Sequence, residues 1–90
     1  MITTLKQRIA DREQQVDAAL IRLANQLHAD PELGWDEYRS SAAVAAVLFA
    51  HGFEVEQPYL GLPTAFRAVF NPGAAFTVGF LAEYDALPGL

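Results

Sequence analysis

Two carboxylates follow an uncharged apolar stretch close to the end of the printed sequence. Glu83 and Asp85 are separated by one residue and come directly after residues 76–82. Side chains at i and i+2 of a strand point to the same face, so the two carboxylates are expected to lie together. They repel each other unless a proton or a cation lies between them, which makes them candidates for a metal site, as ligands or as groups that orient a ligand. The structural alternative is a solvated strand end in which Asp85 caps the following turn.

Residues 76–82 would have to position this pair. The run does not alternate between apolar and polar residues, which predicts a strand buried on both faces of a helix-covered sheet. Alternation at residues 53–56 and the apolar-rich run 64–70 predict two earlier strands. The Asn-Pro-Gly turn signal at residues 71–73 predicts that the second and third strands form an antiparallel hairpin. Asp85 would then lie at the carboxyl end of a strand, where functional groups gather in open α/β sheets.

Residues 4–29 are predicted to form a long amphipathic helix, which Pro31 ends. Thr4 with Gln7 three residues later fits a capping box. We expect the apolar stripe of this helix to face the core, with a partner-binding helix as the alternative. Trp35 is expected to pack the following linker onto the core. The stripe repeats at intervals of three and four residues, at Leu5, Ile9, Val16, Leu20, Leu23 and Leu27.

A second helix is predicted over residues 36–51, with Asp36 or Glu37 at its amino end and Gly52 just beyond its carboxyl end. Its body is almost continuous in small apolar residues, which is typical of a helix buried on several sides. The predicted fold class is therefore α/β, with two amino-terminal helices followed by three strands in one small domain. Two helices are barely enough to cover both faces of the third strand, so we expect part of the fold to lie outside these residues.

The composition excludes several classes of protein. The chain has 90 residues, a net charge of −5 and no cysteine, so neither a nucleic-acid surface nor a disulfide is expected. It shows no signal-peptide pattern and no apolar run of about 20 residues, which predicts a cytoplasmic protein without membrane contact. The hydrophobic fraction of 52% indicates that part of the surface meets another copy, a partner or the rest of a longer polypeptide. His28 and His51 lie at predicted helix carboxyl ends, which suit a cationic side chain, and we expect neither to bind a metal.

Two segments together resemble a known family. Residues 27–38 (LHADPELGWDEY) are similar to the H-x-x-P-E-L-(aromatic)-x-E signature near the start of bacterial amidohydrolases of the aminoacylase/carboxypeptidase metallohydrolase superfamily. Residues 80–89 (FLAEYDALPG) are similar to the next block of that family, a strand followed by (acidic)-x-D-A-L-P. The order of motifs matches through nearly all of residues 20–90. It looks closest to the branch that contains aminobenzoyl-glutamate hydrolase and related dipeptide or N-acyl-amino-acid amidohydrolases.

The resemblance implies that residues 1–90 are an incomplete amino-terminal part of one catalytic domain with a helix-flanked mixed sheet. It also implies a hydrolase of peptide or N-acyl-amino-acid bonds that uses divalent zinc or manganese. Such a metal lowers the pKa of a bound water and polarises the amide carbonyl. Asp85 matches the aspartate that orients a metal ligand in relatives. Glu83 falls where other branches place a metal-binding histidine, so a ligand role for it would be a departure from the pattern of those branches.

In the branch that the motifs resemble, a Gly-His-Ala-Cys-Gly-His segment soon follows the D-A-L-P block and supplies metal ligands. That segment, the catalytic glutamates, the later histidine ligands and the lid or dimerisation domain are absent from these residues. We therefore expect a hydrolase fragment that binds no metal and is inactive alone. The alternative is a small non-enzymatic binding or oligomerisation module that uses its amphipathic helix. A small metal-binding protein built on Glu83 and Asp85 is the weakest interpretation, because two carboxylates supply too few ligands.

Overall fold

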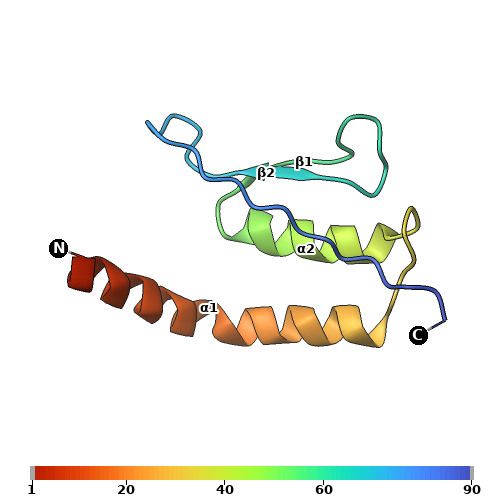
Figure 1. The fold of residues 1–90 in the computed structure, drawn as a ribbon, viewed down its shortest axis with the longest axis horizontal. Helices are drawn as coiled ribbons and strands as arrows, with labels where there is room; N and C mark the ends of the chain where they lie inside the picture. Colours follow the sequence, from red (N-terminus) through yellow and green to blue (C-terminus); the bar gives the residue numbers. More distant parts are fainter. Residues whose placement is uncertain (1, 90) are drawn as a thin grey trace.

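The computed structural model describes residues 2–89, which form two helices followed by two short strands. Helices α1 (Ile2–Ala29) and α2 (Tyr38–Ala50) form an antiparallel pair, and the chain continues into strands β1 (Glu54–Glu56) and β2 (Arg67–Val69). Figure 1 shows three layers, with α2 between α1 and the strand pair. The predicted α/β class is confirmed. Within residues 2–89, neither helix combines the length and the apolar character that a membrane span requires.

The amino end of α1 differs from its prediction. The helix begins at Ile2, so Thr4 lies inside it and cannot serve as the cap that the sequence suggested. Gln7 instead donates a hydrogen bond to Asp11 Oδ1, one turn further along, at 2.9 Å. The other end follows the prediction, since the helix stops at Ala29, ahead of Pro31.

Only part of the apolar stripe of α1 faces the rest of the chain. In its carboxyl-terminal half the stripe residues Val16, Leu23 and Leu27 are half-buried. In its amino-terminal half the helix extends past the end of α2, and Leu5 and Ile9 are exposed (Figure 1). The prediction of a core-facing stripe is therefore correct for the carboxyl-terminal half of the helix and wrong for the amino-terminal half.

Helix α2 ends in a Schellman motif. The N–H of Phe53 donates to the carbonyl of Leu48, and the N–H of Gly52 donates to the carbonyl of Phe49, each at 3.1 Å. Gly52 has a φ of +91°, a conformation that is unfavourable for a residue with a Cβ. The prediction that Gly52 stops this helix is thus confirmed. The body of the helix is less buried than predicted, because within residues 2–89 Ala45 is the one fully buried apolar residue.

The strand predictions are confirmed in part. Strands β1 and β2 pair antiparallel, with Val55 opposite Ala68, and the predicted turn forms through a 3.1 Å bond from the Ala74 N–H to the Asn71 carbonyl. The predicted third strand does not form, since residues 76–82 have no ladder to any other part of residues 2–89. A strand needs a neighbour for its main-chain groups. After the turn the chain runs back past α2 without pairing with β2, so neither the hairpin of the second and third strands nor a mixed sheet is present (Figure 1).

The described chain is extended for its length. Its radius of gyration is 15.2 Å, whereas a compact domain of this length is expected to measure about 12 Å. The best-buried side chains are polar rather than apolar, which is the reverse of an ordinary core. They are Glu32, Ser40, Ser41 and Thr64. All of them lie in or near the amino end of α2, and that end is therefore the part of the molecule that is organised most closely.

Candidate functional site

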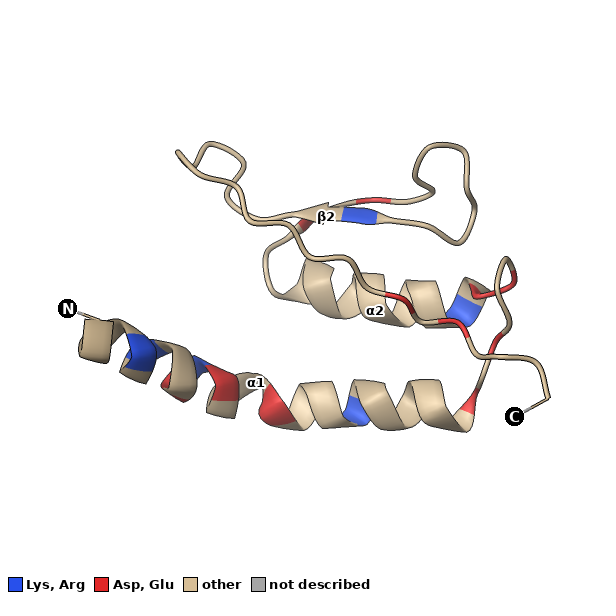
Figure 2. Cartoon of the chain, viewed as in Figure 1, with Lys and Arg blue, Asp and Glu red and all other residues tan. Residues whose placement is uncertain are grey.

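The two family-like motifs meet in space, although about fifty residues separate them in the sequence. The N–H of Ala86 donates to the carbonyl of Glu32 at 2.7 Å. Leu33 and Ala86 form an isolated parallel bridge. The D-A-L-P block therefore lies against the P-E-L linker, and the bridge fixes the residue that directly follows Asp85. Figure 2 shows acidic stretches of both segments near the amino end of α2.

Glu32 caps helix α2 from six residues before its first helical residue. Its carboxylate accepts the N–H of Ser40 at 2.5 Å and the N–H of Arg39 at 3.1 Å. These N–H groups belong to the first helical turn and have no partner within the helix. The hydrogen bonds from Ser40 and Arg39, together with the Arg39 charge, hold the pKa of Glu32 below its usual value despite the opposing effect of burial. The predicted caps are wrong, because Glu37 occupies the N-cap position without a side-chain capping bond.

Arg39 connects this cap to the end of α1. Its guanidinium group binds the Asp30 carboxylate through two hydrogen bonds, of 2.6 and 2.8 Å, and its Nη2 lies 3.5 Å from Glu32 Oε2. The hydrogen bond with Arg39 lowers the pKa of Asp30, and the same contact raises the pKa of Arg39. The Arg39–Asp30 pair is exposed, so solvent screens it. The pair is bidentate and joins the linker to the first turn of α2.

Tyr84 attaches the other side of Asp85 to the same region. Its hydroxyl donates to the main-chain carbonyl of Thr64, and its ring stacks on Phe66 with centroids 6.0 Å apart. The Thr64 hydroxyl in turn donates to Glu37 Oε1 at 3.3 Å. Burial and, secondarily, the nearby charge of Glu37 raise the pKa of Tyr84. The phenol therefore stays protonated as a donor over the whole neutral range.

A groove of about 380 Å³ runs beside these contacts. Asp85 lies at its edge, and a Cβ added to Gly34 would be 3.7 Å from Asp85 Oδ2. Glu83 and Asp85 both line the groove and both are exposed, so the structure brings the predicted pair together at one surface. Trp35 also lines it but is 76% exposed and has a φ of +75°, so its predicted role as a core anchor is wrong.

The residues present do not by themselves form a metal site. Within residues 2–89, no group of three or more His, Cys, Asp or Glu side chains is gathered closely enough to hold a metal ion. Two carboxylates at one chain segment supply too few of the ligands that a divalent cation needs. His51 Nδ1 is 2.7 Å from the Val47 carbonyl of its own helix, an arrangement that fits the predicted structural role. Any metal held near Asp85 would need ligands from residues outside this part of the chain.

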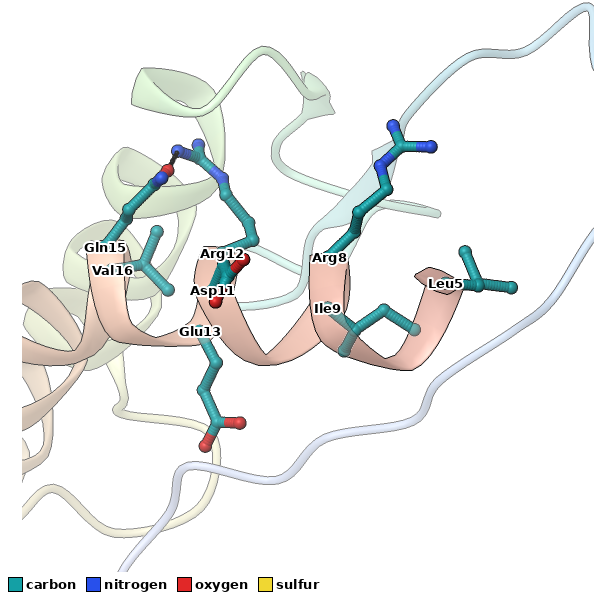
Figure 3. A pocket seen from close by; sticks show the side chains of 8 residues that line it. All are labelled: Leu5, Arg8, Ile9, Asp11, Arg12, Glu13, Gln15 and Val16. Atoms are coloured by element: carbon teal, nitrogen blue, oxygen red, sulfur yellow. Dashed lines mark hydrogen bonds between the residues drawn. The ribbon is translucent and has the colours of Figure 1, made fainter. Parts of the chain in front are cut away.

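A second hollow, of about 750 Å³, lies along the amino-terminal half of α1 (Figure 3). All of its lining residues come from this one helix: Leu5, Arg8, Ile9, Asp11, Arg12, Glu13, Gln15 and Val16. One internal contact is the 2.9 Å hydrogen bond from Arg12 Nη1 to Gln15 Oε1. Because no second element closes this hollow, it offers no enclosed site for chemistry.

Sequence reasoning missed two residues of the candidate site. Glu32 was treated only as part of a motif, although an acidic residue in a short linker before a helix is a recognisable source of an N-terminal cap. Tyr84 carried no signal of its own, because its partner is a main-chain carbonyl twenty residues earlier. Such a partner can be identified only from the folded chain.

The chain is similar in sequence to several peptidases and amidohydrolases. It is 37% identical over 100 residues to the Xaa-Arg dipeptidase of Mus musculus, covering 96% of this chain and 22% of that protein. It is 34% identical over 87 residues to thermostable carboxypeptidase 2 of Saccharolobus solfataricus, covering 93% of this chain and 21% of that protein. It is 36% identical over 81 residues to a component of the p-aminobenzoyl-glutamate hydrolase of Escherichia coli, covering 90% and 16%. No family model matches the chain.

These similarities confirm the resemblance that the two motifs indicated. The chain is a homologue of the amidohydrolase and peptidase superfamily to which these enzymes belong. It spans about a fifth of the length of the curated relatives that it matches. The similarity covers both motifs, since it extends over nine-tenths or more of the chain, and it favours a hydrolase over a separate binding module.

Proposed function

We propose that this chain forms part of the catalytic domain of a metal-dependent amidohydrolase that cleaves peptide or N-acyl-amino-acid bonds. The observation that carries the proposal is the contact between the two motifs, where the Ala86 N–H meets the Glu32 carbonyl at 2.7 Å. Two segments that resemble one family in sequence also form one site in space. The names of the relatives support the substrate class, because they describe a dipeptidase, a carboxypeptidase and a hydrolase of an acylated glutamate.

In this proposal Asp85 orients a metal ligand that other residues of the polypeptide supply. Its neighbours are both anchored, Ala86 by the linker and Tyr84 by the facing loop, so the carboxylate is placed at the groove edge before any ligand arrives. Glu83 lies in the same groove and is the second carboxylate available to a cation. A divalent metal, zinc or manganese, would polarise the amide carbonyl and activate water once its ligands are complete.

The proposal also includes the larger sheet that the sequence predicts. The uncharged segment 76–82 is apolar on both faces, and Phe76 and Phe80 are each 90% exposed. Pairing with further strands would bury both its edges and its faces, as in the inner strand of a helix-flanked mixed sheet. The groove would then lie at the carboxyl end of that strand.

Two measurements test the proposed function. The purified 90-residue chain is expected to hydrolyse no dipeptide or N-acyl amino acid with added zinc or manganese, because the ligand set is incomplete. Metal-dependent turnover by this chain would overturn that statement. The nucleotide sequence after the codon for Leu90 is expected to encode, in some frame, a segment like Gly-His-Ala-Cys-Gly-His. Unrelated sequence in all frames would count against the amidohydrolase.

A further inference from the structure

The two residues that flank Asp85 are both held by the amino end of α2. On one side, the Tyr84 hydroxyl binds the Thr64 carbonyl, and the Thr64 hydroxyl binds the carboxylate of Glu37 at the N-cap position. On the other side, the Ala86 N–H binds the main-chain carbonyl of Glu32. The first turn of α2 is therefore the common base of both restraints.

We propose that Glu32 is a positioning residue that sets the place of Asp85 relative to helix α2. Glu32 uses two groups at once. Its carboxylate is fixed on the N–H groups of Arg39 and Ser40, and its carbonyl accepts the N–H of Ala86. Because one residue makes both sets of bonds, a displacement of its carboxylate displaces the acceptor that holds the residue after Asp85. A residue that only caps the helix would need the carboxylate contacts alone.

The chemistry of the cap explains why a glutamate suits this position. Two N–H donors of the first helical turn face the side chain, and a carboxylate presents an acceptor oxygen to each. A glutamine would present one oxygen and one NH2 group, so one of the two helix donors would face another donor. The side chain of Glu32 is only 5% exposed, so water has little access to replace the lost acceptor.

The importance of this placement for catalysis rests on the proposed function, but the placement itself can be tested without any substrate. Amide hydrogen exchange measured by NMR on the 90-residue chain gives the protection of Ser40 and Ala86 separately. We expect Glu32→Gln to speed exchange of both amides by about tenfold, the size of one charge-assisted hydrogen bond. The matched control is Asp30→Asn, which removes the exposed partner of Arg39 and is expected to change Ala86 exchange by less than about twofold.

Faster exchange at Ser40 with unchanged exchange at Ala86 would overturn the proposal and leave Glu32 as a helix cap only. Ala86→Pro supplies an independent test if the Glu32 variants fail to fold, because it removes the N–H donor and leaves the carboxylate intact. Coupling is reciprocal, so this variant is expected to speed exchange at Ser40. No change at Ser40 would contradict the coupling. Coupled exchange in a polypeptide that proves to have no hydrolase activity would refute the proposed function and leave the positioning role standing.

Discussion

The exposed segment 76–82 is expected to make the 90-residue chain bind hydrophobic dyes and self-associate. Phe76, Val78, Phe80 and Leu81 are 90, 77, 90 and 104% exposed. Burying one such side chain is worth about 1.5–3 kcal/mol, so the four together leave about 6–12 kcal/mol of hydrophobic stabilisation unrealised. That sum is as large as the whole folding free energy of a typical domain, about 5–15 kcal/mol. The main-chain groups of the segment are also unpaired, which favours strand addition.

The assay combines light scattering with the fluorescence of an anilinonaphthalene sulfonate dye over a range of protein concentrations. The perturbation is Phe80→Asp, which places a charge in the middle of the segment and is expected to reduce both association and dye binding. The control is Leu60→Asp, which adds the same charge at a separate loop position that is 79% exposed. A monomer that binds no dye, or an equal response to both substitutions, would refute the reasoning.

Two further predictions concern stability. Contacts at the amino end of α2 lower the pKa values of Asp30 and Glu32, so their contribution is complete above the ordinary carboxyl pKa of about 4 and is lost as pH falls through the lowered values. Thermal unfolding followed between neutral and acidic pH measures this loss, and a melting temperature that rises on acidification would contradict it. Gly52→Ala is expected to destabilise the chain by about 1–2 kcal/mol, because φ is +91° there. Its added Cβ would lie 3.5 Å from the Phe70 ring, an ordinary contact, so the strain lies in the backbone. Gly73→Ala, with no atom within 4 Å of its Cβ, is the control in denaturant unfolding, and equal effects of the two substitutions would refute the backbone explanation.

Local signals in the sequence predicted the helices and their ends well. Apolar spacing located both helices to within two residues at each end, and Pro31 and Gly52 act as the punctuation that they indicated. These features depend on neighbours within one or two turns. The sequence reasoning failed at the amino end of α2, because the cap comes from Glu32 across a linker whose path the local pattern does not specify.

The third strand shows a different limit. The composition of residues 76–82 describes a segment suited to burial on both faces, but it cannot supply the neighbours that burial requires. Within residues 2–89 those neighbours are absent, so the same apolar pattern produces an exposed stretch. The sequence correctly placed Glu83 and Asp85 on one surface, because that depends on their spacing. It did not reveal the anchoring of Tyr84 and Ala86, because that depends on contacts with distant parts of the chain.

The most direct test of the central claim is a chimera in which this chain replaces its aligned region of 87 residues in thermostable carboxypeptidase 2 of Saccharolobus solfataricus. If the chain is a working part of an amidohydrolase, the chimera will hydrolyse carboxypeptidase substrates and will lose that activity on metal chelation. Asp85→Asn is then expected to lower activity by about 10–100-fold, the usual effect of removing a group that orients a metal ligand. Glu54→Gln, on the exposed side of β1, is the control. A folded chimera that remains inactive with zinc or manganese, or one that Asp85→Asn leaves unchanged, would contradict the claim.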